Sequence, residues 1–306
     1  MKILVRVGLE QVVLFLFLAI GVCTAQKVAV TFDDLPLNGD LPPGVTYVDI
    51  ARDALAVLQK YHLPPTYGFV NAKRLEGNPA AAEGLKLWAA SEPIGNHTYS
   101  HFDLNANPVA AFEREMAEDE PALELAAAKD MNWRWLRYPY LHEGDTVEKR
   151  EAVRAYLEAH GYRVAEVTLE WGDYFWNSAY ARCAAKNDAQ SIEWLKTAYL
   201  QNETESIELS RQLSQLVFGR EINHVLLLHL GSFSSTILPD AFDLLKKKGF
   251  QFVTLEEAES DSAYAGDPAE GALGGGTLLD EWMNQKKLKY PEMAPRPYKE
   301  VQEICK

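Results

Sequence analysis

The feature that most constrains this chain is an alternation of short β-rich runs with longer amphipathic stretches, which begins at Gln26. Seven runs have the apolar, β-branched composition of strands: residues 27–32, 65–70, 93–96, 133–137, 162–169, 224–230 and 250–255. Apolar residues recur at helical spacing between several of these runs, at 50–61, 147–157 and 238–245. Because strands that alternate with helices build a parallel sheet covered by helices, the pattern predicts an α/β architecture.

Two features predict where this architecture bends and ends. Pro121 lies inside the helical stretch 109–127. A proline there removes a hydrogen bond and clashes with the preceding turn, so we expect two helical pieces. Residues 261–276 are rich in Ala, Gly, Ser and Asp without periodicity, and they predict a loop. We therefore expect a main domain at residues 26–259 and a C-terminal extension at 260–306 that packs back on it.

The first 25 residues have the pattern of a secretory signal peptide. Two basic residues precede the apolar run 12–22, and a short tripeptide ends at Ala25. A helix that spans a membrane needs about 20 apolar residues, more than this run supplies. We expect export to the periplasm or the medium, with cleavage after Ala25 and no membrane attachment afterwards. A lipoprotein site at Cys23 is the alternative, and the bulky Val22 before it argues against that site.

Cleavage leaves Cys183 and Cys305 as the two thiols of the exported chain. Disulfides persist in such compartments, so one bridge between them is the expectation. The alternative is two unrelated buried thiols.

The composition limits the class of protein and its partners. A chain that is 47% hydrophobic and 24% charged is an ordinary globular protein, which excludes disorder, collagen and coiled coil. Its 44 acidic residues exceed its 30 basic ones and give a net charge of −14. Nucleic-acid binding depends on neutralising phosphates with basic side chains, so no nucleic-acid partner is expected.

Polar side chains follow two of the predicted strands at the point where each strand ends. Asp33 and Asp34 follow the first strand, and His97 and His101 follow the third. In a barrel of parallel strands these ends meet at one face, where loops build a site. Histidines four residues apart can share a metal ion, and a carboxylate completes a three-ligand set with an open position. The alternative is that all four are solvated loop residues.

Three further strand ends carry ionisable side chains. Arg137 ends the fourth strand, where it either holds a carboxylate through a bidentate bond or is a surface guanidinium. The fifth strand leads into Glu170 and Asp173, which add two acids. His229 ends the apolar run 225–228. It is therefore either a buried, hydrogen-bonded residue or a general acid with a carboxylate partner.

Five segments resemble, in order, the five motifs of the polysaccharide deacetylases, which are carbohydrate esterase family 4 with the NodB-homology domain. They are Thr31-Phe32-Asp33-Asp34, His97-Thr98-Tyr99-Ser100-His101, Arg137-Tyr138-Pro139-Tyr140, Glu170-Trp171-Gly172-Asp173-Tyr174 and Leu226-Leu227-Leu228-His229. The resemblance spans roughly residues 27 to 256. It implies the distorted seven-stranded (β/α)7 barrel of that family, which agrees with the seven predicted strands.

The resemblance also implies a role for each matching residue. Asp34, His97 and His101 become the ligands of a divalent metal ion, Zn²⁺, with Co²⁺, Mn²⁺ or Ni²⁺ as alternatives. Asp33 becomes the general base that takes a proton from the attacking water. Arg137 orients Asp33 in this scheme.

The remaining roles involve the later motifs. The backbone N–H of Tyr140 helps bind the oxyanion, and His229 is the general acid. The fourth motif departs from the family pattern of two aspartates three residues apart followed by a tryptophan. Glu170 replaces the first aspartate and Tyr174 the aromatic residue, whereas Asp173 keeps the second carboxylate and is assigned to orient His229. The departure affects the shape and stacking of the sugar subsite more than the chemistry.

Aromatic residues near these motifs are candidate substrate-binding residues. Tyr138, Trp171 and Trp176, together with Tyr140, can offer ring faces to pyranose rings. The alternative is that they belong to the core.

These residues predict a hydrolase that removes N- or O-acetyl groups from an acetylated polysaccharide or oligosaccharide, by attack of a metal-activated water on the acetyl carbonyl. One alternative is a hydrolase of linear or cyclic amides on the same scaffold, and export argues against it. Another is a sugar-binding protein with a degenerate site. The presence of both Asp33 and His229 argues against that alternative.

Overall fold

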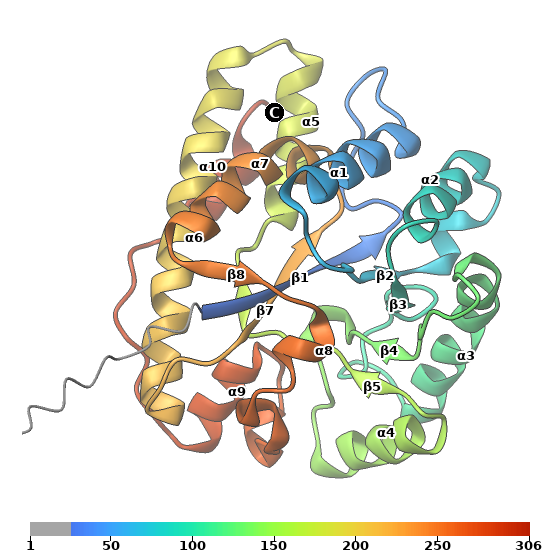
Figure 1. Cartoon of the computed structure of the whole chain (residues 1–306), viewed down its shortest axis with the longest axis vertical. Helices are drawn as coiled ribbons and strands as arrows, with labels where there is room; N and C mark the ends of the chain where they lie inside the picture. The colour runs from blue at the N-terminus through green and yellow to red at the C-terminus, as the bar shows by residue number, and fades with distance from the viewer. Residues whose placement is uncertain (1–25) are drawn as a thin grey trace, which may run out of the picture.

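The computed structural model describes residues 26–306 as an α/β fold around one curled parallel sheet (Figure 1). The predicted (β/α)7 barrel architecture is confirmed. The predicted signal peptide at 1–25 lies outside the described residues. Within residues 26–306, no helix combines the length and the apolar character that crossing a membrane requires.

The strands follow the predicted runs closely, with one exception. Their bounds are β1 Gln26–Leu35, β2 Gly68–Val70, β3 Ile94–Asn96, β4 Trp135–Leu136, β5 Arg163–Val164, β6 Leu169–Glu170, β7 His224–His229 and β8 Phe250–Phe252. The order across the sheet is β5-β4-β3-β2-β1-β7-β6, and β8 also pairs with β1. The predicted run 162–169 is thus two short strands, one at each edge of the sheet. The segment between β5 and β6 therefore bridges the two edges and curls the sheet into a barrel.

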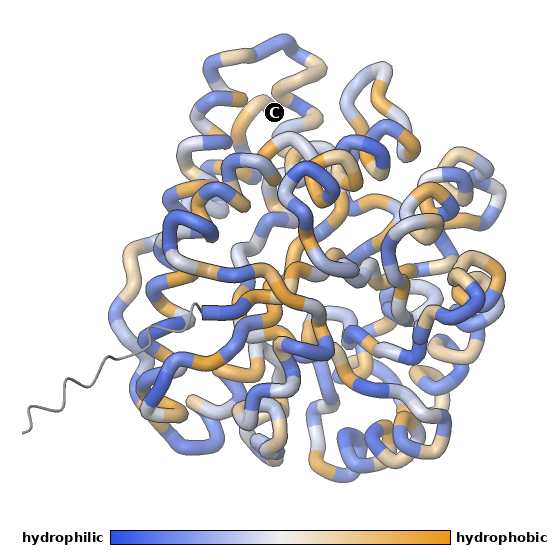
Figure 2. The backbone as a smooth tube through the Cα atoms, in the orientation of Figure 1, coloured by the Kyte–Doolittle hydropathy of each residue, from blue (hydrophilic) through white to orange (hydrophobic). Residues whose placement is uncertain are grey.

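Helices surround the sheet, and apolar segments concentrate toward its strands (Figures 1 and 2). Their bounds are α1 Tyr47–Tyr61, α2 Pro79–Ala89, α3 Val109–Ala126, α4 Val147–Ala159, α5 Tyr174–Ala185, α6 Ala189–Phe218, α7 Ser232–Lys247, α8 Leu255–Ala258, α9 Leu278–Gln285 and α10 Tyr298–Glu303. Four 3-10 segments complete the set: η1 Ala72–Leu75, η2 Pro139–Leu141, η3 Ser262–Ala265 and η4 Ala269–Ala272. The three predicted amphipathic stretches correspond to α1, α4 and α7.

The expectation of two helical pieces around Pro121 is wrong, because α3 runs through the proline. Phe112 and Met116 are buried before Pro121, and Leu123 is buried after it. This continuous buried face stabilises the helix against the loss of one backbone hydrogen bond.

The C-terminal extension packs on the main body through α9. Leu279 and Met283 of α9 share an apolar cluster with Leu213 and Val217 of α6. The backbone N–H of Leu278 donates to the carbonyl of Val167 at 2.7 Å.

A disulfide ties the end of the extension to α5. Cys183 and Cys305 are bonded, with their Cα atoms 5.1 Å apart, so the predicted bridge is confirmed. The C-terminus accordingly lies beside α5 and α10 (Figure 1).

Candidate functional site

A β-bulge at the end of β1 brings two adjacent carboxylates into one site. Phe32 pairs with Gly68 and Leu35 with Val70, so two residues of β1 stand opposite one residue of β2. Asp34, one of the two, has the left-handed φ of 64°. Successive side chains of a regular strand point to opposite faces, and the bulge removes that constraint. Asp33 and Asp34 therefore both reach the same cavity.

The two histidines follow β3 in a tight turn. His97 directly follows the last residue of β3, and His101 lies one turn later with a φ of 59°. Asn96 Oδ1 accepts the backbone N–H of Thr98 at 2.8 Å, and Asn71 Nδ2 donates to the carbonyl of His97 at 2.7 Å. These bonds hold the turn so that the two imidazole centroids lie 4.9 Å apart.

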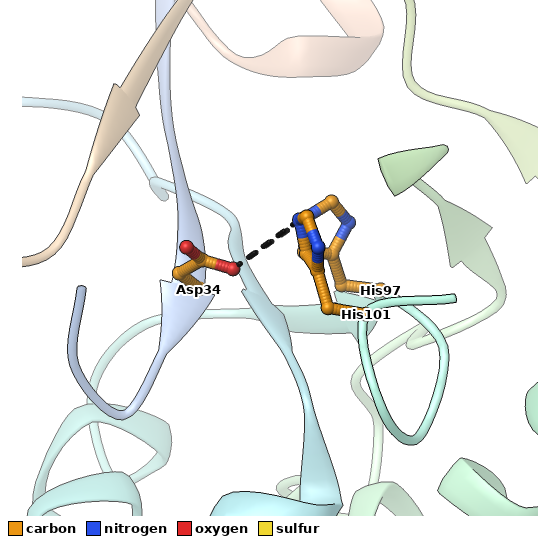
Figure 3. A group of neighbouring side chains, drawn as sticks. All are labelled: Asp34, His97 and His101. Carbon is orange, nitrogen blue, oxygen red and sulfur yellow. Dashed lines mark ion pairs between the residues drawn. The ribbon is translucent and has the colours of Figure 1, made fainter. Parts of the chain in front are cut away.

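Asp34, His97 and His101 point toward one another (Figure 3). Asp34 Oδ1 lies 3.8 Å from His97 Nε2 and 3.6 Å from His101 Nε2. His97 Nδ1 donates to the backbone carbonyl of Arg137 at 2.7 Å, which leaves its Nε2 free to face the cluster. Asp34 Oδ1 is buried and accepts no hydrogen bond from any residue in the described part of the chain. Two imidazole nitrogens and a carboxylate oxygen that accepts no hydrogen bond fit a divalent transition metal ion.

Electrostatics keeps these three side chains in their ligating forms. Burial lowers the pKa of His97 and of His101, so both imidazoles are neutral near pH 7. Burial acts to raise the pKa of Asp34, but Arg74 and the nearby histidines outweigh it and hold that pKa below its usual range. Metal binding requires neutral histidine and ionised carboxylate, and both are present here.

Two residues that the sequence did not single out hold Asp34. Asn38 Nδ2 donates to Asp34 Oδ2 at 2.7 Å, and Arg74 of η1 lies 3.2 Å from Asp34 Oδ1. Asn177 in turn donates to Asn38 Oδ1 at 3.0 Å. Asn38 lies four residues after Asp34, but no spacing rule marks it as a partner before the chain is folded.

Arg137 holds Asp33 in one orientation. Its Nη1 donates to both oxygens of Asp33, at 3.0 and 3.3 Å. Nε donates to the carbonyl of Ala165 at 2.7 Å, and Nη2 donates to Thr31 Oγ1 at 3.0 Å. Arg137 is completely buried, so it is not the surface guanidinium of the alternative. Burial outweighs Arg137 and raises the pKa of Asp33 to about 6.

Asp173 holds His229 opposite Asp33. Asp173 Oδ1 lies 2.7 Å from His229 Nδ1, and Oδ2 accepts the backbone N–H of His229 at 2.7 Å. His229 pairs with Asp33 in the register of β7 and β1. Burial acts to lower the pKa of His229, but the Asp173 carboxylate outweighs it and raises that pKa to about 9.

One cavity of about 530 Å³ is lined by Asp33, Asp34, His97, His101 and His229. Tyr140 lies at its rim, 59% exposed, with its ring centroid 4.5 Å from that of His101. Tyr174 is 43% exposed, with its ring 5.3 Å from His229. Glu170 also lines the cavity, and burial raises its pKa. The extension contributes Asp280 and its neighbours to the wall, which the sequence did not predict.

Of the three predicted sugar contacts, Tyr138 lines the cavity, whereas Trp171 and Trp176 do not. Trp171 and Trp176 are fully buried and pack against Tyr199 of α6, with centroids 6.3 and 5.3 Å apart. Tyr138 is 2% exposed and stacks on Phe112. The two tryptophan rings therefore belong to the core. The exposed rings at the cavity are Tyr140, beside His101, and Tyr174, beside His229.

Comparisons with known proteins agree with this fold. A family model described as polysaccharide deacetylase matches residues 22–165. No sequence among the curated proteins matches significantly.

Solved structures were also similar. One is a mutant of a family 4 carbohydrate esterase pseudoenzyme with restored enzymatic activity, at 15% identity over 76% of this chain and 67% of that chain, with a TM-score of 0.52. The wild-type pseudoenzyme, from Bacillus anthracis, is 14% identical over 76% and 65% of the chains, with a TM-score of 0.51. A polysaccharide deacetylase from Bacillus cereus is 19% identical over 75% and 91%, with a TM-score of 0.50. At these identities the likeness concerns the fold.

Proposed function

We propose that this chain, whose residues 22–165 match the polysaccharide deacetylase family model, is a metal-dependent hydrolase of acetylated sugars in a polysaccharide or oligosaccharide. One observation carries the proposal. An Asp–His–His cluster shares a cavity with two further ionisable side chains, Asp33 and His229. Asp33 forms an ion pair with Arg137, and His229 forms one with Asp173. That set supplies a metal site, a base and an acid.

The base and the acid have opposite protonation states near neutral pH. Asp33, with its pKa raised to about 6, is ionised at pH 7 and can accept a proton from an attacking water. His229, with its pKa raised to about 9, is protonated at the same pH and can donate to the departing amine or alkoxide. Two titratable groups whose environments separate their functions in this way are typical of acid–base catalysis.

Asp34, His97 and His101 would hold the metal ion, with Zn²⁺ as our choice and Co²⁺, Mn²⁺ or Ni²⁺ as substitutes. When bound, the ion polarises the acetyl carbonyl and lowers the pKa of water. The chain's own groups do the rest. Arg137 fixes the Asp33 carboxylate toward the cavity, and Asp173 fixes the ring of His229.

The backbone N–H of Tyr140 is the proposed oxyanion donor. Tyr140 has the left-handed conformation φ 60°, ψ 8°, which is sparsely populated for residues with a side chain. Such backbone conformations concentrate at functional sites, where they aim a backbone group. The exposed rings of Tyr140 and Tyr174 are the proposed faces for sugar stacking, in place of the buried tryptophans.

We further propose that the chain is exported and acts outside the cytoplasm, where acetylated cell-wall and extracellular glycans are found. The pattern of residues 1–25 supports this.

The decisive test is acetate release from a panel of chitooligosaccharides, peptidoglycan, acetyl-xylan and simple linear and cyclic amides. We expect acetate from at least one glycan, loss of activity on chelation, and recovery with Zn²⁺ or Co²⁺. The Asp33→Asn variant is the matched negative control, because it keeps the metal ligands. Turnover of amides without any glycan would favour the amide hydrolase, and glycan binding without turnover would favour a degenerate, sugar-binding protein.

A further inference from the structure

A second cluster of acidic side chains lies where the extension meets the barrel. Glu143 follows η2, Glu166 lies between β5 and β6, and Glu281 belongs to α9. One oxygen from each lies within 4.8 Å of the others. Glu143 and Glu281 are only 3% and 2% exposed. Three segments far apart in sequence thus bring carboxylates to one buried point.

A tyrosine hydroxyl lies beside the same three carboxylates. Tyr138 lines the same small internal cavity as the three glutamates. Its hydroxyl is buried and has no hydrogen-bond partner among residues 26–306, and the same is true of Glu281 Oε2. The cavity leaves about 10 Å³ for the centre of an ion or a water molecule, which suits one particle. Buried polar groups are otherwise almost always paired, so these two atoms call for a ligand.

The ion pairs that the structure describes around this cavity involve one of the three glutamates and not the other two. Glu143 Oε2 accepts from Arg150 at 2.9 Å and from Arg154 at 3.0 Å, and Arg150 also pairs with Asp267. Within the described chain, neither Glu166 nor Glu281 has an ion-pair partner within 4.0 Å. Arg150 and Arg154 pair with Glu143 and Asp267, so no direct ion pair within residues 26–306 neutralises Glu166 or Glu281. Burial and the neighbouring carboxylates raise the pKa of both, although the nearby Arg150 and Arg154 act in the opposite direction.

We propose that Glu143, Glu166, Glu281 and the Tyr138 hydroxyl bind one hard divalent cation, Ca²⁺, at the junction of barrel and extension. All the ligands are oxygens, which suit Ca²⁺ and disfavour ions that prefer nitrogen. The carboxylates come from three segments, so the geometry can adapt to the flexible coordination of Ca²⁺.

A cation bound at this junction would also affect the cavity that holds Asp33 and His229. Glu281 is adjacent in sequence to Asp280, which lines the cavity that holds Asp33 and His229. A cation that joins Glu281 to the barrel fixes α9, and with it this part of the cavity wall. The inference does not depend on the deacetylase proposal, because it concerns a separate set of ligands.

The test is Ca²⁺ titration of the chelator-treated full chain after one equivalent of Zn²⁺ has been restored. We expect calorimetry to show one Ca²⁺ per chain beyond the Zn²⁺. We also expect Tm to rise by about 5 °C at a hundredfold excess over the Kd. Glu281→Gln, which keeps the side-chain shape, should lose Ca²⁺ binding by at least ~100-fold while Zn²⁺ content stays at one. Tyr138→Phe should weaken binding by roughly tenfold.

The matched control is Glu292→Gln, at an exposed glutamate of the same extension, which should bind Ca²⁺ like the wild type. Far-ultraviolet circular dichroism and Zn²⁺ content establish that each variant is folded. The inference is overturned if the wild type takes up no Ca²⁺ at ~10 mM, above the range of weak extracellular sites. It is equally overturned if Glu281→Gln keeps the Ca²⁺-dependent rise in Tm. If Glu281→Gln is more stable than a wild type that ignores Ca²⁺, the cluster holds protons instead, and the cation site does not exist.

Discussion

Two clusters of three candidate metal-binding side chains in residues 26–306 are alike in burial and different in chemistry. In each, one atom from each of three side chains lies within 4.8 Å of the others. Asp34, His97 and His101 offer two nitrogens and one oxygen and open into a cavity of about 530 Å³. The glutamate cluster offers oxygens alone around a closed space of about 10 Å³. Donor atoms and access, more than the amount of buried acid, separate a catalytic metal site from a structural one.

The acid–base groups sharpen this difference. Asp33 and His229 lie beside the first cluster, and each has its own buried partner, Arg137 or Asp173. The arginines of the second cluster instead pair with Glu143 and Asp267. Only the first cluster is therefore equipped to move protons.

The largest effect is expected from Asp34→Asn, which removes the charged ligand of the first cluster. At one equivalent of Zn²⁺ we expect activity to fall by at least ~10³-fold, because the ion is no longer held where the carbonyl binds. Excess Zn²⁺ should restore part of the activity. Zn²⁺ content measured by elemental analysis checks the result, with Glu281→Gln as the variant that should keep Zn²⁺. Normal Zn²⁺ content in Asp34→Asn would contradict the assignment.

Asp33→Asn should separate base from ligand. We expect kcat to fall by roughly 10²–10⁴-fold, the usual contribution of a general base, with Zn²⁺ retained. Arg137→Ala should resemble a milder form of this variant. Loss of Zn²⁺ on changing Asp33, with retention on changing Asp34, would exchange the two roles.

The sequence predicts the first cluster far better than the second. His97 and His101 are four residues apart, and the Asp33-Asp34 pair ends a strand, so local pattern and family resemblance together find them. Their assembly depends on a bulge that the pattern does not show, since a regular strand would turn the two carboxylates apart. Glu143, Glu166 and Glu281 are scattered over three segments, and only the folded extension brings them together.

The helices and the aromatic residues likewise differ in how well the sequence predicts them. Strongly periodic apolar stretches predict α1 and α7, because the apolar stripe and the buried face coincide. The 30-residue helix α6 is not predicted from the sequence, because Asn202, Glu203 and Ser206 interrupt the apolar residues of its buried face. Residue type alone did not distinguish the buried Trp171 from the exposed Tyr174, since aromatic rings serve cores and sites alike.

Asp173→Asn should produce a smaller effect, visible in the pH profile. His229 has its pKa raised from 6.5 to about 9, so the wild type should keep kcat/KM up to about pH 9 and lose it above. Without the Asp173 charge that pKa falls, and the alkaline limb should move to lower pH, with activity at pH 8 reduced by about 10²-fold.

The interaction of His229 with Asp173 should also make folding stability depend on pH. A histidine whose pKa is raised in the folded state stabilises fully below pH 6.5 and loses that contribution as pH rises through about 9. The free energy of unfolding should therefore depend less on pH in Asp173→Asn. An activated aryl ester, whose leaving group needs no proton, is the control substrate and should lose much less activity. Equal losses on ester and amide, or an unmoved alkaline limb, would point to a structural histidine.

Reduction of the Cys183–Cys305 disulfide should have the smallest effect and should act on one cluster only. The bond ties the end of the extension to α5, and removing such a constraint typically costs about 2–5 kcal/mol of folding stability. Unreduced protein should show no free thiol. After reduction we expect hydrogen exchange to rise first in residues beyond Glu259, Ca²⁺ affinity to weaken a few-fold, and Zn²⁺ content to stay unchanged, because the ligands Asp34 and His97 belong to the barrel. The Cys183→Ser, Cys305→Ser double variant should reproduce the reduced state. An equal rise in hydrogen exchange around β1 and β3 would show that the extension stabilises both clusters. The two clusters would then differ in their ligand chemistry but would not be independent in stability.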